Sequence, residues 1–318
     1  MSVIAMTIER IENGPAVVPL SVPKARRRKQ TLVAYLFLLP WFGGLILFTS
    51  GPLLASLYLS FTSFDLFRAP EWLGLSNYID LFALDPRFRK AVGVTFMYVL
   101  IGVPLNLGFA LLIAVLMNQK VRALGLFRGI YYLPSLLGGS VAVAVMWRQL
   151  FSGDGVINQM LGTFGIAAPS WISTPQYALY TLILLHVWQF GSAMIIFLAG
   201  LQQVPAELYE AAEIDGATGL QKFVNVTVPM ITPVIFFNLV LGVINSFQAF
   251  TSAYIISGGS GGPADSTLFY TLYLYQEGFA NFRLGYASAM GWVLLLIIAA
   301  FTGLNFLASK RWVFYGDK

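Results

Sequence analysis

The chain has 318 residues, of which 58% are hydrophobic and only 10% are charged, and its mean hydropathy is +0.74. An ordinary soluble domain has roughly 25% charged residues, so this composition excludes a soluble protein and indicates a polytopic membrane protein. The chain has no cysteine and one histidine, His186, which excludes disulfides, thiolate chemistry and a metal site built on clustered histidines. The net charge of +5 favours contact with anionic lipid over a nucleic-acid partner.

The first segment, residues 1–30, is polar and ends in the basic run Lys24–Lys29. It contains no apolar stretch followed by a small-residue cleavage site, so we predict a cytoplasmic tail and not a signal peptide. Residues 31–310 are then expected to form one transmembrane domain, and residues 311–318 a short cytoplasmic C-terminal tail.

Six apolar segments follow the tail, and each is long enough to cross a bilayer core that needs roughly 20 helical residues. We predict an all-α fold with six transmembrane helices at about Leu32–Phe61, Val92–Met117, Leu126–Phe151, Ala178–Leu201, Val228–Ile256 and Tyr286–Ala308. The connections on one side carry mixed charge, aromatics and glycines, so we expect them to fold as short caps on the membrane face; they are Thr62–Ala91, Ser152–Gln176 and Ser257–Leu284.

The Lys and Arg residues predict the orientation of these helices. If the N-terminus is cytoplasmic, the outer segments hold only Arg68, Arg87, Arg89, Lys90, Arg148 and Arg283, and all other Lys and Arg residues lie on the inner side. Basic residues favour the cytoplasmic side, and an even number of spans places both termini there. The polar segment between the fourth and fifth spans is therefore expected to be cytoplasmic.

Asp and Glu are absent from all six predicted spans. Intramembrane charges are costly and usually mark ion or proton pathways, so this absence argues against a transporter driven by an ion gradient. His186 is the one titratable group near the middle of a span, and we interpret it as a structural histidine in preference to a proton relay.

Polar residues gather in the fourth and fifth spans and form a candidate substrate pathway. Amide and hydroxyl groups beside an aromatic face suit the hydroxyls and the C–H face of a sugar ring. The same residue types also hold membrane helices together, and both interpretations stay open. The candidate residues are Trp188, Gln189, Ser192, Asn245, Ser246 and Gln248.

No catalytic or metal-binding constellation is found. The sequence has neither a GxxxxGK[ST] loop nor an HExxH motif, so we predict that the chain is not an enzyme and that any ATP is used by a partner.

The longest polar interruption in the second half of the chain is Gln203–Pro233. Pro205 suits the start of a helix, acidic Glu207 and Glu210 lie near its positive end, and Gly216 predicts its stop. Small and apolar residues recur at helical spacing on one face, namely Leu208, Ala211 and Ala212. This pattern fits either an amphipathic helix on the membrane surface or a face that another protein approaches closely.

This stretch resembles the EAA loop in the membrane subunits of bacterial binding-protein-dependent ATP-binding-cassette importers. The matching positions are Glu210, Ala211, Ala212, Asp215, Gly216, Ala217, Phe223, Pro229 and Pro233. Further segments are similar to the sugar-importing branch of that family, namely Leu73–Tyr78, Arg128–Pro134 with Trp147, Gly155 and Asn158, Gly261–Pro263, and Tyr273–Met290. The chain departs from the family pattern on the outer side, with the turn SGGSGGP at Ser257–Pro263 and with Gly93 where an Asn is common.

The resemblance implies a type I importer permease that forms half of a pathway for a sugar or oligosaccharide. It implies a coupling loop at about 203–227 that docks on the ATPase through Glu207, Leu208, Glu210, Ala211, Ala212, Asp215, Gly216, Ala217 and Phe223. The expected partners are a second, different permease subunit, an ATP-binding-cassette ATPase dimer that uses ATP and Mg, and a solute-binding protein. The chain itself would bind no cofactor and would lie in the bacterial inner membrane. The alternatives are a stand-alone secondary sugar transporter and a membrane scaffold without a pathway.

Overall fold

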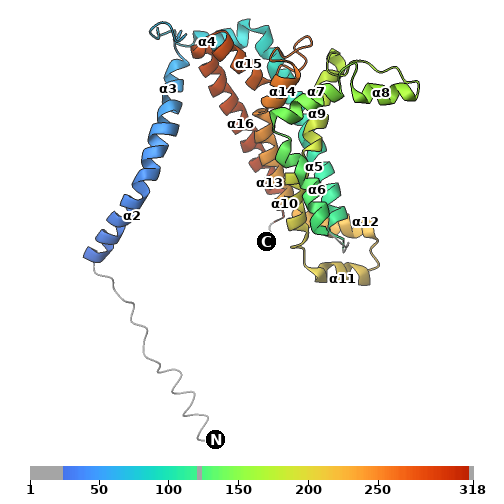
Figure 1. Ribbon diagram of the computed structural model, residues 1–318. Helices are drawn as coiled ribbons and strands as arrows, with labels where there is room; N and C mark the ends of the chain where they lie inside the picture. The colour runs from blue at the N-terminus through green and yellow to red at the C-terminus, as the bar shows by residue number, and fades with distance from the viewer. Residues whose placement is uncertain (1–23, 120–123, 315–318) are drawn as a thin grey trace, which may run out of the picture. The chain divides into compact units, whose positions relative to one another are not determined.

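The computed structural model describes residues 24–119 and 124–314, and the chain divides into two units, residues 1–55 and 56–318 (Figure 1). The regular structure of the described residues is helical, and an isolated bridge between Thr62 and Trp72 is their only β-pairing. The predicted all-α fold is therefore confirmed. Within these described ranges, four helices are long and apolar enough to cross a membrane, or up to six if each of two bent helix pairs counts as one span.

The first unit is a long apolar helix. It comprises α2 (Lys24–Gly44), the π-helical turn η1 (Leu45–Ser50) and most of α3 (Gly51–Leu59). None of its described side chains is buried within the chain, and Tyr35–Leu59 is long enough to cross a membrane. The helix starts at Lys24, so the basic run that ends the predicted tail is helical. The rest of that tail, residues 1–23, lies outside the described residues.

The second unit is organised around α5 (Pro86–Met117), which packs against α9, α10 and α13. Asp85 begins α5 because its side chain accepts a hydrogen bond from the Phe88 amide, and Pro86 occupies the first turn, where a missing N–H costs nothing. Small residues such as Ala110 and Ala114 are fully buried, which lets neighbouring helices approach α5 closely.

The third and fourth predicted spans are each divided into two helices by a break. The third consists of α6 (Leu124–Leu137) and α7 (Val141–Leu150), bent by 94°, and the fourth of α9 (Pro175–Trp188) and α10 (Gly191–Leu201), bent by 43°. The first break falls at Gly138 and Gly139, and the Ser140 side chain then starts α7 by accepting from the Val143 amide.

The last two spans are continuous in the membrane but end at other residues than predicted. The fifth runs through α12 (Gly219–Lys222), η3 (Phe223–Thr227) and α13 (Val228–Phe247). It ends at Phe247, and α14 (Thr251–Ile256) is a separate short helix. The sixth, α16 (Leu284–Trp312), is slightly longer than its apolar segment.

The three connections that the sequence assigns to the outer side contain short helices. They contain α4 (Ser76–Ile79) with η2 (Asp80–Leu84), α8 (Val156–Thr163), and α15 (Tyr270–Tyr275) with η4 (Gln276–Ala280). Side-chain amides tie these caps to backbone carbonyls: Asn77 donates to Ser60 and Thr62. The remaining helix, α11 (Ala206–Ile214), lies at the opposite end of the bundle (Figure 1).

Candidate functional site

The polar stretch after the fourth span folds as predicted into a short helix with a glycine stop. Pro205 precedes the first helical residue of α11, and Glu207 lies in its first turn. Gly216 has a φ of +75°, a conformation that is strained for residues with a Cβ. The Gly216 amide donates to the Glu213 carbonyl and the Ala217 amide to the Ala212 carbonyl, so the last carbonyls of α11 are satisfied by the turn.

The loop is joined to the base of the fifth span by side-chain contacts. The Tyr209 hydroxyl and Thr227 Oγ1 are 2.9 Å apart, and Lys222 forms an ion pair with Glu213. The hydrogen bond and charge of Lys222 lower the pKa of Glu213 below its ordinary value. α12 starts with a capping box between Thr218 and Gln221. The loop therefore has a defined shape that is connected to both neighbouring spans.

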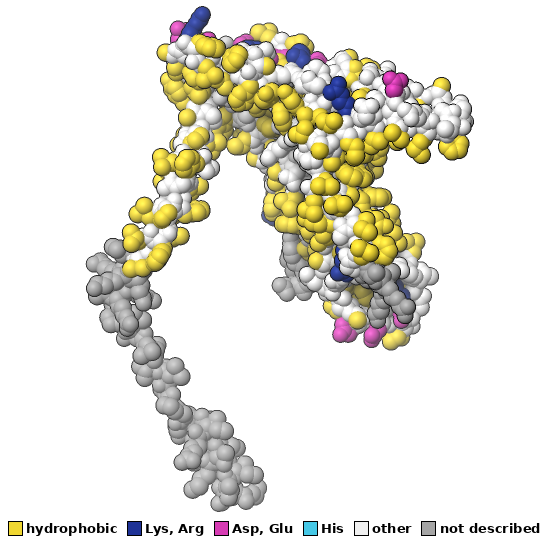
Figure 2. Space-filling model, viewed as in Figure 1, with side chains coloured by type: hydrophobic (Ala, Val, Ile, Leu, Met, Phe, Trp, Pro, Cys, Tyr) yellow, Lys and Arg dark blue, Asp and Glu magenta, His cyan; other side chains and the backbone are white. Residues whose placement is uncertain are grey.

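The exposed face of this loop combines acidic and apolar side chains. Glu207, Glu210, Ala211 and Asp215 are exposed, Leu208 is 40% exposed, and Ala212, Ala217 and Phe223 are half-buried. Two large apolar side chains that sequence reasoning missed are even more open, Ile214 at 87% and Leu220 at 74%. Glu210 makes no hydrogen bond or ion pair with any described residue, and the ion pair within the loop uses Glu213. Figure 2 shows acidic side chains at this end of the molecule.

A cavity of about 380 Å³ lies among α5, α6, α9, α10, α13 and α14. Four of the six predicted pathway residues line it, namely Gln189, Ser192, Asn245 and Ser246. The other two do not: the Trp188 ring packs beside Trp147 at 6.0 Å between centroids, and Gln248 ends α13. Further polar lining residues come from other spans and were not predicted, namely Tyr98, Asn106 and Ser135. A single Asn inside an apolar span was the available signal for Asn106.

The described lining of this cavity holds no Asp, Glu, Lys or Arg, and its polar groups are amides, hydroxyls and the ring of His186. His186 is held among neighbours from two helices, α5 and α13: its ring centroid lies 5.4 Å from that of Tyr98, its Nε2 lies 3.5 Å from Ser246 Oγ, and its carbonyl accepts from Asn106 at 2.7 Å. Groups of this kind can exchange hydrogen bonds with a hydroxylated solute.

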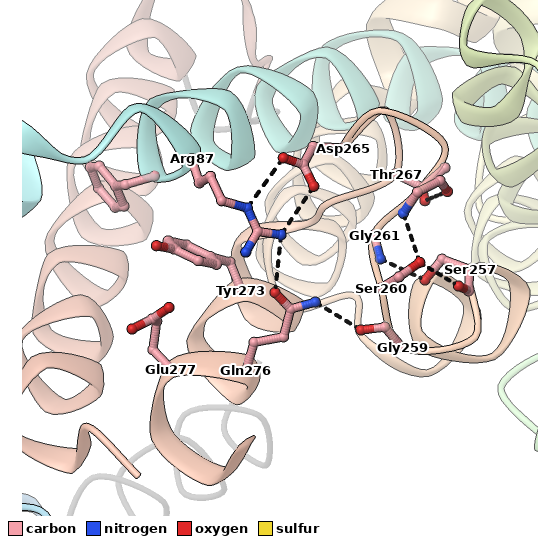
Figure 3. A network of polar contacts seen from close by, with 12 residues as sticks. Arg87, Ser257, Gly259, Ser260, Gly261, Asp265, Thr267, Tyr273, Gln276 and Glu277 are labelled. Atoms are coloured by element: carbon pink, nitrogen blue, oxygen red, sulfur yellow. Dashed lines mark hydrogen bonds and ion pairs between the residues drawn. The ribbon is translucent and has the colours of Figure 1, made fainter. Parts of the chain in front are cut away.

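A network of polar contacts lies at the end of the same unit opposite α11 (Figure 3). The Arg87 guanidinium, at the start of α5, binds both carboxylate oxygens of Asp265 at 3.0 and 3.2 Å, and it donates to the Gln276 side chain at 3.3 Å. Gln276 in turn donates to the Gly259 carbonyl at 2.7 Å. The bidentate pair therefore fixes the connection between α14 and α15 to the start of α5.

Asp85 is the second anchor at this end. Its Oδ2 accepts hydrogen bonds of 2.6 Å from both the Tyr273 and the Tyr286 hydroxyls. Burial alone would raise the pKa of Asp85, but these two hydrogen bonds and those from the backbone amides outweigh it, so its pKa lies below the ordinary value. The carboxylate thereby joins the start of α5 to α15 and to the start of α16.

Among the described residues, no group of three or more His, Asp or Glu side chains could hold a metal ion. The molecule instead offers an exposed loop at one end, a polar cavity among its helices, and a rim at the other end that the contacts of Asp85 and Arg87 fix.

Comparison with known proteins identifies the family. Residues 85–313 match the family described as the binding-protein-dependent transport system inner membrane component. The chain belongs to this family. The resemblance stated from the coupling loop is thus confirmed, and the match extends from the start of α5 through α16.

Curated relatives agree with this assignment over almost their full lengths. The chain is 52% identical over 292 residues to a probable ABC transporter permease, YesP of Bacillus subtilis, covering 92% of this chain and 94% of the relative. It is 33% identical over 291 residues to the lactose transport system permease LacF of Rhizobium radiobacter, with 90% and 96% covered. It is 32% identical over 268 residues to the arabinooligosaccharide transport system permease AraP of Bacillus subtilis, with 83% and 84% covered.

A solved structure supports the fold. A chain from the crystal structure of a bacterial alginate ABC transporter, in complex with a periplasmic protein that carries an alginate pentasaccharide, superimposes with a TM-score of 0.77. The two chains are 21% identical, and the match covers 89% of this chain and 96% of the other. The protein is therefore a multi-pass membrane permease with the fold of an ABC importer subunit.

Proposed function

We propose that this chain is a permease subunit of an ATP-driven importer and forms half of the pathway for a sugar or oligosaccharide that a solute-binding protein delivers from outside. The observation that carries the proposal is the family match over residues 85–313, which includes an exposed helical loop at one end of the bundle. Relatives named for lactose and arabinooligosaccharides, together with a cavity lined by amides and hydroxyls, favour a carbohydrate cargo.

α11 is the contact with the ATPase in this proposal. A docking helix needs a defined shape, an apolar contact surface and polar groups that fix its register. The Gly216 turn and the Glu213–Lys222 pair supply the shape, and Leu208, with small Ala211 beside it, supplies part of the contact surface. The exposed carboxylate of Glu210 is free to accept a charge-assisted hydrogen bond from the partner.

The energy source and the partners complete the proposal. Two ATP-binding-cassette ATPases bind ATP and Mg, a second and different permease forms the other half of the pathway, and this chain binds no cofactor and catalyses no reaction. The loop end faces the cytoplasm of a bacterial inner membrane, as do both termini. The outer rim at Asp85 and Arg87 then faces the binding protein.

The pathway residues proposed here are the four that line the cavity, Gln189, Ser192, Asn245 and Ser246. Their amides and hydroxyls both donate and accept, as sugar hydroxyls do. A neutral lining also gives a solute no deep electrostatic trap, so the solute can leave after the pathway opens.

ATPase activity of the reconstituted complex tests this function. The chain is reconstituted with candidate permease and ATPase partners, with and without a binding protein loaded with lactose, an arabinooligosaccharide or an alginate pentasaccharide. We expect hydrolysis that depends on the loaded binding protein and collapses in Glu210→Ala. Gln202→Ala, an exposed polar position just before the loop, is the matched control and should retain stimulation. Sugar flux without any ATPase would instead establish the secondary transporter.

A further inference from the structure

The breaks in the third and fourth spans lie side by side. Side chains at each break form hydrogen bonds with free backbone groups at the other. A broken helix leaves carbonyls at the end of its first half and amides at the start of its second half without partners. Inside a membrane such groups must find protein partners or line a polar cavity, because lipid offers none. At these two breaks the partners are supplied by the opposite span.

Ser135 of α6 serves both halves of the fourth span. Its hydroxyl donates to the Gln189 carbonyl at 2.8 Å, at the end of α9, and accepts from the Ser192 amide at 2.9 Å, in the first turn of α10. Phe190, the residue before α10, has no side chain that could cap the helix. One hydroxyl therefore acts as C-terminal and N-terminal cap across the break.

Gln189 of the fourth span forms a hydrogen bond with the third span in the opposite direction. Its side-chain amide donates to the Gly138 carbonyl at 3.1 Å, where α6 has ended. A Cβ at Gly138 would overlap the Gln189 side chain, so only glycine permits this approach. Ser135 and Gln189 together form what we call the reciprocal cap.

The four half-helices associate as two pairs on either side of the reciprocal cap. The inner halves α6 and α10 touch at Gly191, where a Cβ would lie 2.5 Å from the Tyr131 carbonyl oxygen. The outer halves α7 and α9 are joined by Trp147, whose indole N–H donates to the Thr181 carbonyl at 3.0 Å. Each pair therefore has a direct contact of its own, and the reciprocal cap lies where the pairs meet.

The inner pair is connected to the proposed ATPase contact. Only residues 202–205 separate α10 from α11, and backbone hydrogen bonds from Gln202 to Leu198 and from Gln203 to Gly200 keep this connection compact. A displacement of α11 therefore reaches α10 directly. Within the fourth span, the first point where it can be absorbed without breaking helical hydrogen bonds is the break at Gln189 and Phe190.

We propose that Ser135 and Gln189 are positioning residues of a hinge, which sets the angle between the inner pair α6 and α10 and the outer pair α7 and α9 at the wall of the cavity. The hinge follows from the geometry of this chain, and its effect on transport rests on the proposed function. Because both residues also line the cavity, a solute hydroxyl that bonds Gln189 competes with Gly138 and so changes the hinge. This links occupancy of the cavity to the position of α11.

Distance measurements on the assembled complex test the hinge without transport. The chain has no cysteine, so spin labels can be placed at exposed Gln176→Cys in α9 and Ala199→Cys in α10. In nanodiscs without ATP or sugar, we expect the distance distribution to broaden or shift in Ser135→Ala and Gln189→Ala, and to return to the parent form in Ser135→Thr. Controls are Ser309→Ala and Asn305→Ala, whose side chains bond only their own helix α16. Equal distributions in all variants would overturn the hinge.

Basal ATPase of the same complexes, without binding protein, measures the coupling. We expect a rise of threefold or more in Ser135→Ala and Gln189→Ala, and no change in Ser309→Ala or Asn305→Ala. Changed label distances with unchanged ATPase activity would refute the coupling to α11 but would still support the hinge. If the parent complex hydrolyses ATP but never responds to a binding protein, the proposed function fails, and the distances still decide the hinge.

Discussion

Gly216 shows how one residue fixes the shape of the proposed coupling loop. Its φ of +75° turns the chain directly after α11, and no atom outside its neighbours lies within 4 Å of where a Cβ would stand. A substitution is therefore opposed by backbone strain of about 1 kcal/mol or more and not by a clash. The chain has room to insert and fold with a side chain there, but the turn will change.

We expect Gly216→Trp to uncouple transport while the protein still inserts in the membrane. The strained turn displaces the start of α12 relative to α11, and the bulky ring covers part of the surface proposed for the ATPase. ATP-dependent uptake should fall at least tenfold at equal amounts of protein in the membrane, measured by uptake and by quantitative blotting. Uptake at the parent rate by a stable Gly216→Trp protein would refute the role of this turn.

Substitution of Gly285 is opposed by lack of space for a side chain and not by backbone conformation. Gly285 lies in the first turn of α16, its amide donates to the Phe64 carbonyl at 2.9 Å, and a Cβ would overlap the Thr62 carbonyl. Gly285→Ala should therefore lower the free energy of unfolding by about 1–3 kcal/mol, the usual cost of overpacking. Gly303→Ala, in the same helix with open space around it, is the control. Thermal unfolding of the two variants in detergent checks this, and equal midpoints would contradict it.

At the scale of elements, Asp85 joins three helices through one carboxylate. Asp85→Asn removes the charge that accepts from Tyr273 and Tyr286, so we expect a loss of about 2 kcal/mol, the range of hydrogen bonds to charged groups. Thermal unfolding at neutral pH measures this loss. Phe82→Ala, at an exposed ring nearby, provides a control for changes at this rim. An unchanged midpoint in Asp85→Asn would show that the neutral amide replaces the carboxylate.

The pH dependence of this anchor has a definite sign. The pKa of Asp85 is lower in the folded protein than the value of about 3.9 expected for an unfolded chain. Its contribution is therefore complete above about pH 4 and is lost as the pH falls through the folded pKa. Unfolding curves at a series of acidic pH values should show a loss in the parent protein that is smaller in Asp85→Asn. Parallel curves would contradict it.

The Arg87–Asp265 ion pair holds the connection between α14 and α15 in place. Both side chains are partly exposed, so the pair is worth no more than about 1 kcal/mol to overall stability. Its local effect is larger, because it holds the connection between α14 and α15 to the start of α5. We expect Asp265→Ala to increase amide hydrogen exchange in residues 257–268 with little change in unfolding temperature. Exchange in Asp80→Ala should match the parent protein, and equal exchange in all three would refute this anchoring role.

For the whole molecule, the cavity distinguishes the proposed pathway residues that line it from polar residues of the same spans that lie outside it. Asn245→Ala removes an amide from the cavity wall, whereas Gln248→Ala changes an exposed amide outside it. We expect Asn245→Ala to lower uptake of the transported sugar about tenfold, as for one lost hydrogen bond to a bound solute, and Gln248→Ala to leave it near the parent rate. Equal uptake by both variants would favour the scaffold interpretation.

Much of the architecture could be predicted from the sequence, because long apolar segments and a polar helix with a glycine stop are local signals. The breaks at Gly138 and Gln189 could not, since apolar composition continues across them and the capping partners lie far apart in sequence. For the same reason, the set of residues that lines the cavity could be predicted only in part. Gln189 and Asn245 stand out as polar residues in apolar spans, but whether Trp188 or Ser135 faces the same space depends on the bends.

The sequence separation between Gly138 and Gln189, whose hydrogen bond joins the two breaks, has a consequence for biosynthesis. Gly138 and Gln189 are 51 residues apart, so the third span leaves the ribosome and reaches the insertion machinery well before its partner exists. During that interval the Gly138 carbonyl has no Gln189 to bond, and transfer into lipid alone would leave it unpaired. The third and fourth spans are therefore expected to enter the membrane as a pair, and a nascent chain truncated after residue 170 should remain next to the insertion channel.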